Sequence, residues 1–432
     1  MGIFCLYNMT SLLNRFLDHP SITIDTRTIV PGQIYFAIKG EHFDGNQFVM
    51  QALEKGASIC VSSDKTFLGV ENVVVVDDTL KALQKLASEY RLTFDIPVLA
   101  ITGSNGKTTT KELLATVLQT KYKTHYTLGN LNNHLGVPLT LLATPKDAQF
   151  IIVEMGANHQ GEIHDLCKIA LPDYGAITNI GIAHIEGFGS PEGVKIAKSE
   201  LFYHVNTYGK KFFLNTTEQS LLFLQDPNNK RIKELDYGGT FIEPRDSDNG
   251  FLIINYRKKR VVTNLVGDYN MPNLVLALGV GEYFGCDPDL MIDAIQSYQP
   301  TNNRSQLMKI DEVEIIMDAY NANPSSMSHA VDNIINLKQV DRGVILGDML
   351  ELGENSMMYH RLILQKIRDA KGVISMVILV GPQFYALKVD FPEFIYYKNT
   401  DEAKVGLHWS QYSGYKVLIK GSRGLQLEKL IN

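Results

Sequence analysis

Short apolar runs alternate with segments of helical periodicity along most of this chain. The runs over 98–101, 150–153 and 376–380 have the length and composition of buried strands. Between such runs, apolar residues recur three or four positions apart, as within 113–118, which is typical of a helix with one buried face. Strands that alternate with helices predict an α/β protein whose sheets are mostly parallel.

The pattern divides the chain into three expected domains. A small α/β domain covers residues 1–95, a central α/β domain covers 96–298, and a Rossmann-like α/β domain covers 299–432. Two strands on either side of Arg257–Arg260 predict a β-hairpin extension of the central domain. A length of 432 residues agrees with about three domains of ordinary size.

Composition narrows the function classes. Hydrophobic residues make up 45% and charged residues 20%, which is ordinary for a soluble globular protein. A net charge of -6 argues against a general nucleic-acid or membrane-surface role, and no apolar run approaches the ~18 residues of a membrane span. The four cysteines lie far apart and the first residues do not form a signal peptide, so we expect a cytoplasmic protein with free thiols.

The clearest chemical signal is the stretch 97–110, where a buried strand runs through a glycine-rich turn into a helix. Such a turn directs backbone N–H groups and the helix N-terminus at phosphate oxygens. The full P-loop pattern requires a glycine at the position where this chain has Ile101. The alternative interpretation is therefore a glycine-rich turn that occurs by chance and binds no phosphate. The candidate nucleotide-binding residues of this turn are Gly103, Asn105, Gly106, Lys107, Thr108 and Thr109.

Candidate metal ligands follow the next strands. Glu154 ends the apolar run 150–153, and the carboxyl ends of parallel strands are where ligands bind in open α/β sheets. Together with the Thr108 hydroxyl, this carboxylate is placed to hold Mg²⁺. His184 also follows the end of an expected strand, although Mg²⁺ prefers oxygen ligands. Lys198, taken alone, is typical of the solvated face of a helix.

Several polar clusters leave two interpretations open. Asp25, Arg27 and Lys39 are ordinary surface charges or binders of an anionic substrate. The asparagine-rich loop 128–138 supplies turns or faces a ligand, and Asn270 and Asn273 precede a helix that they could cap. Polar residues also follow three expected strands of the C-terminal domain, which favours closure of that domain over a nucleotide bound by its neighbour.

Taken together, these stretches resemble the Mur ligases, the ATP-dependent amide-forming enzymes of peptidoglycan synthesis. The resemblance covers essentially the whole chain and rests on 102–109, on Glu154-Met155-Gly156, and on His184, Asn273, Arg304 and Asp318 in the family's order. It accounts for Ile101, because the family's loop is the shorter Thr-Gly-Ser-Asn-Gly-Lys-Thr form. Tyr269 departs from the histidine that family members often carry there.

The resemblance implies roles for individual residues. Lys107, Lys198, Arg304 and His184 would be catalytic, and Asn273, Arg304 and Asp318 would bind ATP with the glycine-rich turn. Thr108, Glu154, His184 and Lys198 would hold Mg²⁺, with two ions expected and Lys198 carried as a carbamate. A carbamate supplies the anionic oxygen that an ammonium group lacks.

Within the family, several stretches are most similar to members that join D-alanyl-D-alanine to UDP-N-acetylmuramoyl-tripeptide. Among them are Asp25-Thr26-Arg27, 129–138, 320–324, 347–353 and 420–424. This implies a UDP-substrate-binding N-terminal domain and an ATP-binding central domain. It also implies substrate contacts from Asp25, Thr26, Arg27, Lys39, Asn132, Asn133, Asn321 and Asn323. We expect a monomer, and the sequence leaves open whether the third residue of the tripeptide is lysine or diaminopimelate.

Two other functions stay open at this stage. One is a related amide ligase with another acceptor, such as a folylpolyglutamate synthetase or a Mur ligase that adds a single amino acid. The other is a nucleotide-dependent binding protein without enzymatic activity. The N-terminal domain and Asn321-Ala322-Asn323-Pro324 argue against the first, and Lys107, Glu154 and Lys198 together argue against the second.

Overall fold

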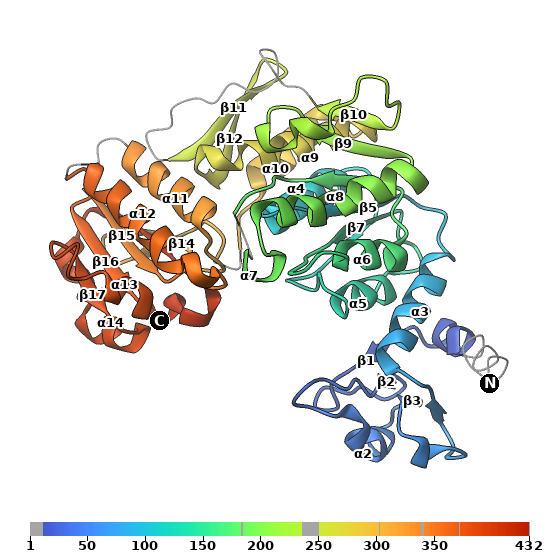
Figure 1. Cartoon of the computed structure of the whole chain (residues 1–432). Helices are drawn as coiled ribbons and strands as arrows, with labels where there is room; N and C mark the ends of the chain where they lie inside the picture. The colour runs from blue at the N-terminus through green and yellow to red at the C-terminus, as the bar shows by residue number, and fades with distance from the viewer. Residues whose placement is uncertain are drawn as a thin grey trace.

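Three larger β-sheets with their helices and one two-stranded sheet make up the described part of the protein in this computed structural model (Figure 1). The structure describes residues 12–182, 185–235, 250–301, 303–337, 341–370 and 372–431. The predicted three-part α/β architecture is confirmed. None of the described helices is both long and apolar enough to cross a membrane.

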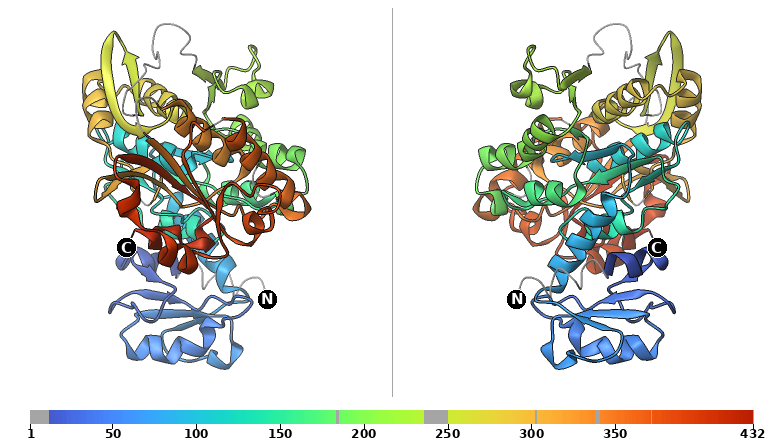
Figure 2. Two further views of the ribbon diagram at one scale, coloured as in Figure 1. Left: turned by 90° about the vertical axis from the view of Figure 1, so that its left-hand side faces the viewer. Right: turned by 90° about the vertical axis from the view of Figure 1, so that its right-hand side faces the viewer.

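The N-terminal sheet has four parallel strands in the order β1-β2-β3-β4. Helix α2 (Val49–Glu54) covers one face, and α3 (Thr79–Arg91) begins at an Asp78 cap. Helix α3 also packs on α5 (Gly136–Leu142) and α6 (Glu162–Ala170) of the next domain, and Figure 2 shows the chain leading through this helix from the N-terminal part into the middle part. One apolar core runs from the N-terminal sheet into the middle one. The strands are β1 (Ile22–Thr23), β2 (Ile34–Phe36), β3 (Ile59–Ser62) and β4 (Val73–Val75).

The middle sheet has six parallel strands in the order β10-β9-β8-β5-β7-β6. In β5, Val98 and Ala100 face one apolar core while Leu99 and Ile101 face the other, which is why the run is continuously hydrophobic. The strands are β5 (Val98–Thr102), β6 (Thr124–Tyr126), β7 (Phe150–Glu154), β8 (Tyr174–Ile177), β9 (Lys211–Asn215) and β10 (Ile232–Leu235). The helices are α4 (Lys107–Leu118), α5 (Gly136–Leu142), α6 (Glu162–Ala170), α7 (Ile185–Phe188), α8 (Pro191–Tyr208), α9 (Met271–Tyr283) and α10 (Pro288–Ser297).

The predicted hairpin is present, but its turn is shorter than expected. Strands β11 (Phe251–Tyr256) and β12 (Lys259–Val266) pair antiparallel across Arg257 and Lys258 alone. The prediction of a turn over Arg257–Arg260 was therefore wrong. Both turn residues have positive φ, 48° and 66°, as a two-residue hairpin turn requires.

The C-terminal sheet has six strands in the order β13-β14-β18-β15-β16-β17, and only the β13–β14 pair is antiparallel. Separate apolar cores cover its two faces. The strands are β13 (Gln306–Ile310), β14 (Val313–Asp318), β15 (Asp341–Gly347), β16 (Met376–Val380), β17 (Ile395–Tyr397) and β18 (Tyr415–Lys420). The helices are α11 (Pro324–Asn336), α12 (Ser356–Asp369), α13 (Pro382–Ala386) and α14 (Thr400–Gly406).

Candidate active site

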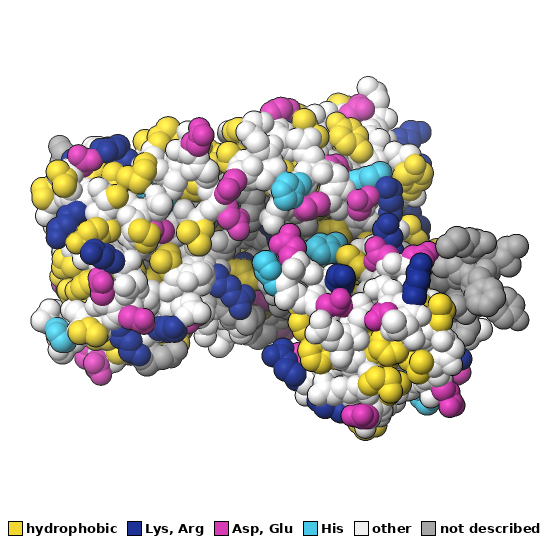
Figure 3. Space-filling model, turned by 60° about the horizontal axis from the view of Figure 1, so that its bottom comes forward, with side chains coloured by type: hydrophobic (Ala, Val, Ile, Leu, Met, Phe, Trp, Pro, Cys, Tyr) yellow, Lys and Arg dark blue, Asp and Glu magenta, His cyan; other side chains and the backbone are white. Residues whose placement is uncertain are grey.

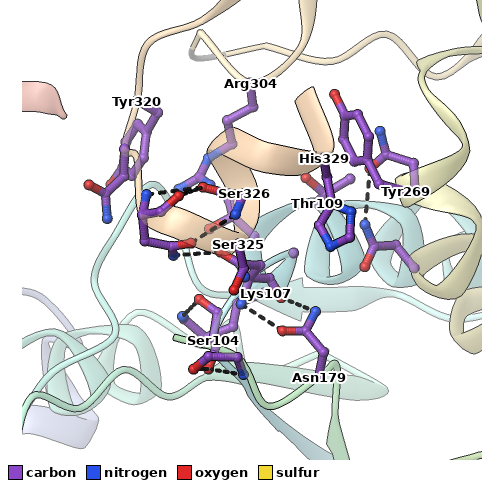
Figure 4. Close-up of a pocket in the computed structure, with 18 of the residues that line it drawn as sticks. Ser104, Lys107, Thr109, Asn179, Tyr269, Arg304, Tyr320, Ser325, Ser326 and His329 are labelled. Atoms are coloured by element: carbon purple, nitrogen blue, oxygen red, sulfur yellow. Dashed lines mark hydrogen bonds between the residues drawn. The ribbon is translucent and has the colours of Figure 1, made fainter. Parts of the chain in front are cut away.

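A cleft of about 750 Å³ lies between the middle and C-terminal domains. Its middle-domain wall contains the glycine-rich turn after β5, and its opposite wall contains β14, α11 and Arg304 (Figure 4). The cleft brings together most of the residues predicted from the sequence, and these are Asn105, Gly106, Lys107, Thr108, Thr109, Asn132, Asn133, Glu154, Asn273, Arg304, Asp318, Asn321 and Asn323.

The glycine-rich turn has the geometry that its sequence predicts. Gly106 immediately precedes α4 with φ of +77°, and a Cβ there would lie 2.5 Å from Asn273 Oδ1. Asn273 also accepts a hydrogen bond from Thr110 Oγ1 at 3.0 Å. It is therefore packed on the turn, while the Asn270 side chain donates to Val266 O. The alternative in which Asn270 caps α9 was wrong, because no side chain caps that helix.

Lys107 folds back over the turn that carries it. Its Nζ donates to Gly103 O at 2.7 Å and to Ser104 O at 3.3 Å. Burial lowers the pKa of the Lys107 ammonium, with Arg304 adding to this effect and Glu154 opposing it. Gly103 is not among the residues that line the cleft. A Cβ at this position would collide with Thr178, so the tight turn requires a glycine here.

Glu154 ends β7 and is 1% exposed. Its Oε1 accepts hydrogen bonds from Thr108 Oγ1 at 3.1 Å and from Asn132 Nδ2 at 2.7 Å. Its other oxygen, Oε2, is buried and has no hydrogen-bond partner in the structure. A buried carboxylate oxygen without a donor is favourable only beside a cation. The Thr108 hydroxyl and the Glu154 carboxylate are also oxygen donors of the kind that Mg²⁺ takes.

Lys111 is a residue of this site that the sequence analysis missed. It is 1% exposed, and its Nζ lies 3.3 Å from Gly129 O and 3.9 Å from Glu154 Oε2. Burial lowers its pKa, although the nearby Glu154 carboxylate opposes this. Its position one helical turn after Thr108, among buried apolar residues of α4, was the available signal.

Lys198 is also buried, at 1% exposure, which overturns the reading of a solvated helix face. It lies on α8, donates to Ala157 O at 3.3 Å and sits 5.0 Å from the centre of the Phe188 ring. Burial lowers the pKa of its amine to about 7, and the positive charge of Lys107 adds to the shift. His184 lies outside the described residues, and within them no three His, Cys, Asp or Glu side chains gather as a metal cluster.

The two walls of the cleft are joined by direct contacts. Asn323 Nδ2 donates to Asn105 Oδ1 at 2.7 Å, and the Ser325 hydroxyl accepts from Ile182 N at 3.2 Å. Asn179, which the sequence analysis did not single out, holds the turn from below: its side chain accepts from Asn105 N and donates to Asn105 O. Figure 4 shows Asn179 and Ser104 on one side and Ser325, Ser326 and His329 on the other.

Arg304 and Asp318 form the far wall. The Arg304 guanidinium stacks on Tyr320 at 3.7 Å from the ring centre, and its buried Nε has no hydrogen-bond partner. Asp318 accepts from Lys420 Nζ at 2.6 Å and from Ser305 N at 3.2 Å. Register explains the ion pair, because Asp318 and Lys420 are paired at the ends of neighbouring strands.

The predicted substrate residues are only partly brought to the cleft. Asp25, Thr26, Arg27 and Lys39 are not among its lining residues. Asp25 and Arg27 form an ion pair at 2.7 Å, and the Arg27 hydrogen bonds hold the pKa of Asp25 at about 2. Asn133 and Asn321 line the cleft but also serve local turns, through Gly136 N and Ala322 N respectively.

A strand–turn–helix phosphate site facing a second α/β domain defines a nucleotide-binding protein whose site is shared by two domains. Comparison with known proteins places the chain more narrowly. Residues 20–91 match the model of the Mur ligase family catalytic domain, 101–281 that of the Mur ligase middle domain, and 303–423 that of the Mur ligase glutamate ligase domain. The chain belongs to the Mur ligase family.

Individual relatives are similar in sequence or structure to this chain along nearly their whole length. The UDP-N-acetylmuramoyl-tripeptide–D-alanyl-D-alanine ligase of Bacillus subtilis is 33% identical, over 95% of this chain and 92% of that protein. The enzyme of the same name from Escherichia coli is 30% identical over 99% and 97%. A crystal structure of MurF from Acinetobacter baumannii superposes with a TM-score of 0.84 at 29% identity, covering 95% and 92% of the chains. MurF from Thermotoga maritima in complex with ADP gives 0.81 at 26% identity, covering 95% and 96%.

Proposed function

We propose that this protein is an ATP-dependent ligase that joins D-alanyl-D-alanine to UDP-N-acetylmuramoyl-tripeptide in peptidoglycan precursor synthesis. The observation that carries the proposal is the full-length similarity to enzymes of that name, combined with a P-loop turn that faces Arg304 and Asp318 across one cleft. The similar MurF that was solved with ADP supports ATP as the nucleotide.

The chemistry needs an activated carboxyl group. The terminal carboxylate of the tripeptide attacks the γ-phosphate of ATP, ADP leaves, and an acyl phosphate forms. The amine of D-alanyl-D-alanine then attacks the acyl carbon, and the tetrahedral intermediate collapses to the amide and phosphate. None of these steps needs a covalent enzyme intermediate, so the protein contributes positioning, charge neutralisation and exclusion of water.

Residues of the cleft are assigned by their positions. Lys107 releases its carbonyl partners to reach the β- and γ-phosphates, and Arg304 neutralises the phosphoryl oxygens from the other wall. Asn273 and Asp318 position the nucleotide. Asn132, Asn133, Asn321 and Asn323 face the other substrates from the same cleft.

Mg²⁺ fits the donor set around Glu154. Glu154 Oε2, which has no hydrogen-bond donor and only the Lys111 ammonium nearby at 3.9 Å, and the Thr108 hydroxyl would hold one ion. Lys198 would contribute to a second as a carbamate, together with His184. A lysine whose pKa falls to about 7 is partly neutral at physiological pH, and only the neutral amine adds CO₂. When bound, Mg²⁺ supplies positive charge against the phosphate oxygens.

The three domains are proposed to bind different substrates. Residues 1–95 would bind the UDP end of the tripeptide substrate, with Asp25, Thr26, Arg27 and Lys39 as contacts; residues 96–298 would bind ATP; and residues 299–432 would close over both. A monomer in the cytoplasm fits this scheme, since one chain carries both walls of the cleft.

Phosphate release tests the proposal. Purified protein with ATP, Mg²⁺ and UDP-N-acetylmuramoyl-tripeptide should release phosphate with D-alanyl-D-alanine and not with single amino acids. Substrates that carry lysine or diaminopimelate as the third residue are compared in parallel. If a single amino acid is a substrate and the dipeptide is not, the chain is a Mur-type ligase with another acceptor. No phosphate release with any acceptor contradicts the enzymatic proposal.

A further inference from the structure

The connection between α10 and β13 carries the chain from the middle domain to the C-terminal domain, and Arg304 lies near its end. Figure 3 shows the hollow between the C-terminal part and the rest of the molecule, with Lys and Arg side chains visible in it. The residues on either side of Arg304 have left-handed backbones, with φ of 56° at Asn303 and 51° at Ser305. A left-handed serine costs free energy and persists only where other contacts hold it in place.

Two hydrogen bonds hold Ser305, one to each domain. Its N–H donates to Asp318 Oδ1 at 3.2 Å within the C-terminal domain. Its hydroxyl is hydrogen-bonded to the Tyr269 hydroxyl of the middle domain at 2.8 Å. Burial raises the pKa of Tyr269, and the Asp318 carboxylate adds to this effect, so the Tyr269 hydroxyl is protonated at neutral pH. The contact therefore joins the middle domain to the residue that follows Arg304.

The position of Tyr269 is itself fixed by the wall that carries the glycine-rich turn. A Cβ at Gly267 would lie 2.3 Å from the Tyr269 ring, so the ring packs directly on this glycine, whose φ is +84°. The next residue, Asn270, accepts a hydrogen bond from Asn273 Nδ2 at 3.0 Å, and Asn273 is packed on the glycine-rich turn. A continuous set of contacts thus runs from the phosphate-binding turn to the connection between the domains.

We infer that Tyr269 is a positioning residue whose hydrogen bond to Ser305 holds Arg304 in place for phosphoryl transfer from ATP. The inference rests on the proposed function, which assigns Arg304 to the phosphoryl oxygens. Arg304 Nε is buried without a hydrogen-bond partner, so the side chain is held by stacking on Tyr320 and by the backbone that carries it. Without the Tyr269 contact, Ser305 relaxes toward negative φ, which redirects the Arg304 side chain.

Steady-state kinetics with ATP and equilibrium binding of ADP test the inference, because ADP lacks the phosphoryl group that Arg304 neutralises. Tyr269→Phe removes the hydroxyl and keeps the packed ring. It should lower kcat/KM for ATP about 10-fold, the effect of one lost hydrogen bond, and change the Kd for ADP less than about 2-fold. Tyr396→Phe is the matched control: it removes a buried hydroxyl that donates to Phe391 O at 2.9 Å, does not line the cleft, and should keep wild-type kinetics.

Two variants of Ser305 separate the backbone from the hydroxyl. Ser305→Ala should lower kcat/KM for ATP as much as Tyr269→Phe does, and the double variant should be no worse than either single one, because both changes remove the same contact. Ser305→Gly also lacks the hydroxyl but adopts positive φ without strain, so it should keep more activity than Ser305→Ala. Equal losses in these two variants would contradict the role of the left-handed backbone.

Three results overturn the inference. The first is a Tyr269→Phe variant with wild-type kcat/KM for ATP. The second is a loss of ADP affinity as large as the loss in kcat/KM, which would make Tyr269 a direct nucleotide contact. The third is a double variant whose losses multiply, which would make Tyr269 and Ser305 independent. If wild-type protein releases no phosphate with any acceptor, the proposed function itself has failed.

Discussion

The two walls of the main cleft differ in how far their polar groups are already satisfied. On the middle-domain wall, Lys107, Thr108 and Asn273 each have hydrogen-bond partners from the same domain. On the C-terminal wall, Asp318 and Asn323 also have partners, but the buried Arg304 Nε has none. The exception on the middle-domain wall is Glu154 Oε2, the oxygen that we assign to Mg²⁺.

The middle-domain wall therefore has its polar groups in place before substrates bind, whereas the C-terminal wall gains a partner for Arg304 only when a substrate binds. Preorganised groups lose little on reaction because their orientation is fixed during folding. A buried group without a partner costs free energy in the unliganded protein, and a ligand that pairs with it removes this cost, so such groups favour binding of the matching substrate. Changes on the prebuilt wall should therefore affect catalysis and folding together, whereas changes on the other wall should affect substrate affinity.

The largest expected effect is that of Lys198→Met. Losing the proposed carbamate should lower kcat on the order of 10²- to 10³-fold, as for other groups that stabilise charge in a transition state. Lys198→Ala should behave similarly and regain activity with formate or acetate, which can replace the missing carboxylate oxygens. Steady-state phosphate release measures both, and full activity of either variant contradicts the role of Lys198.

Folding of the same variant has its own pH signature. The pKa of Lys198 falls from an ordinary 10.5 to about 7 on burial, so between these values the unfolded chain binds more protons and stability rises with pH. The unfolding free energy of wild type relative to Lys198→Met should therefore rise from pH 7 to 10, by at most about 1.4 kcal/mol per pH unit. Urea unfolding in CO₂-depleted buffer measures it. If the difference in unfolding free energy between wild type and Lys198→Met does not change with pH, the Lys198 ammonium group is solvated in the folded protein and the prediction is wrong.

Lys111→Met should have the next largest effect. The change leaves Gly129 O and the buried Glu154 carboxylate without their nearby positive charge. We expect a loss of about 2 kcal/mol in unfolding free energy. We also expect a stronger Mg²⁺ dependence of ADP binding, because a positive charge that repels the ion is removed from beside Glu154. Urea unfolding and titration of ADP with and without Mg²⁺ check this. Lys168→Met, which removes an exposed pair with Asp165, is the control and should change stability by less than about 0.5 kcal/mol.

What the sequence could predict depended on whether neighbours in the chain are neighbours in space. The turn from Gly103 to Thr109 is local, and Glu154 follows from the rule that strands end at the ligand-binding edge of a sheet. Most strands of the three larger sheets were predictable from periodicity, and so was their α/β class, whereas β6, β10 and β13 were not expected. Lys111 lies within the same local motif and was missed because a lysine in a helix is normally exposed.

The rest of the site comes from contacts between distant segments. Asn179 meets Asn105 across 74 residues, and Asn323 meets Asn105 across 218. The burial of Lys198 comes from the packing of α8 around Ala157 and Phe188, which no local pattern of charges records.

The smallest expected effect tests the contact that already joins the two walls. Asn323 has two roles: its Oδ1 accepts from Ser326 N as the cap of α11, and its Nδ2 donates to Asn105. Asn323→Ser keeps a capping oxygen and loses only the contact between domains, so stability should change by less than about 0.5 kcal/mol while the KM for ATP rises a few-fold. Asn323→Ala should lose the cap as well and about 1 kcal/mol more. Urea unfolding and ATP kinetics on the two variants separate the roles. An equal loss of stability in both would mean that the contact with Asn105, rather than the cap, stabilises this region, and that the C-terminal wall is as prebuilt as the other.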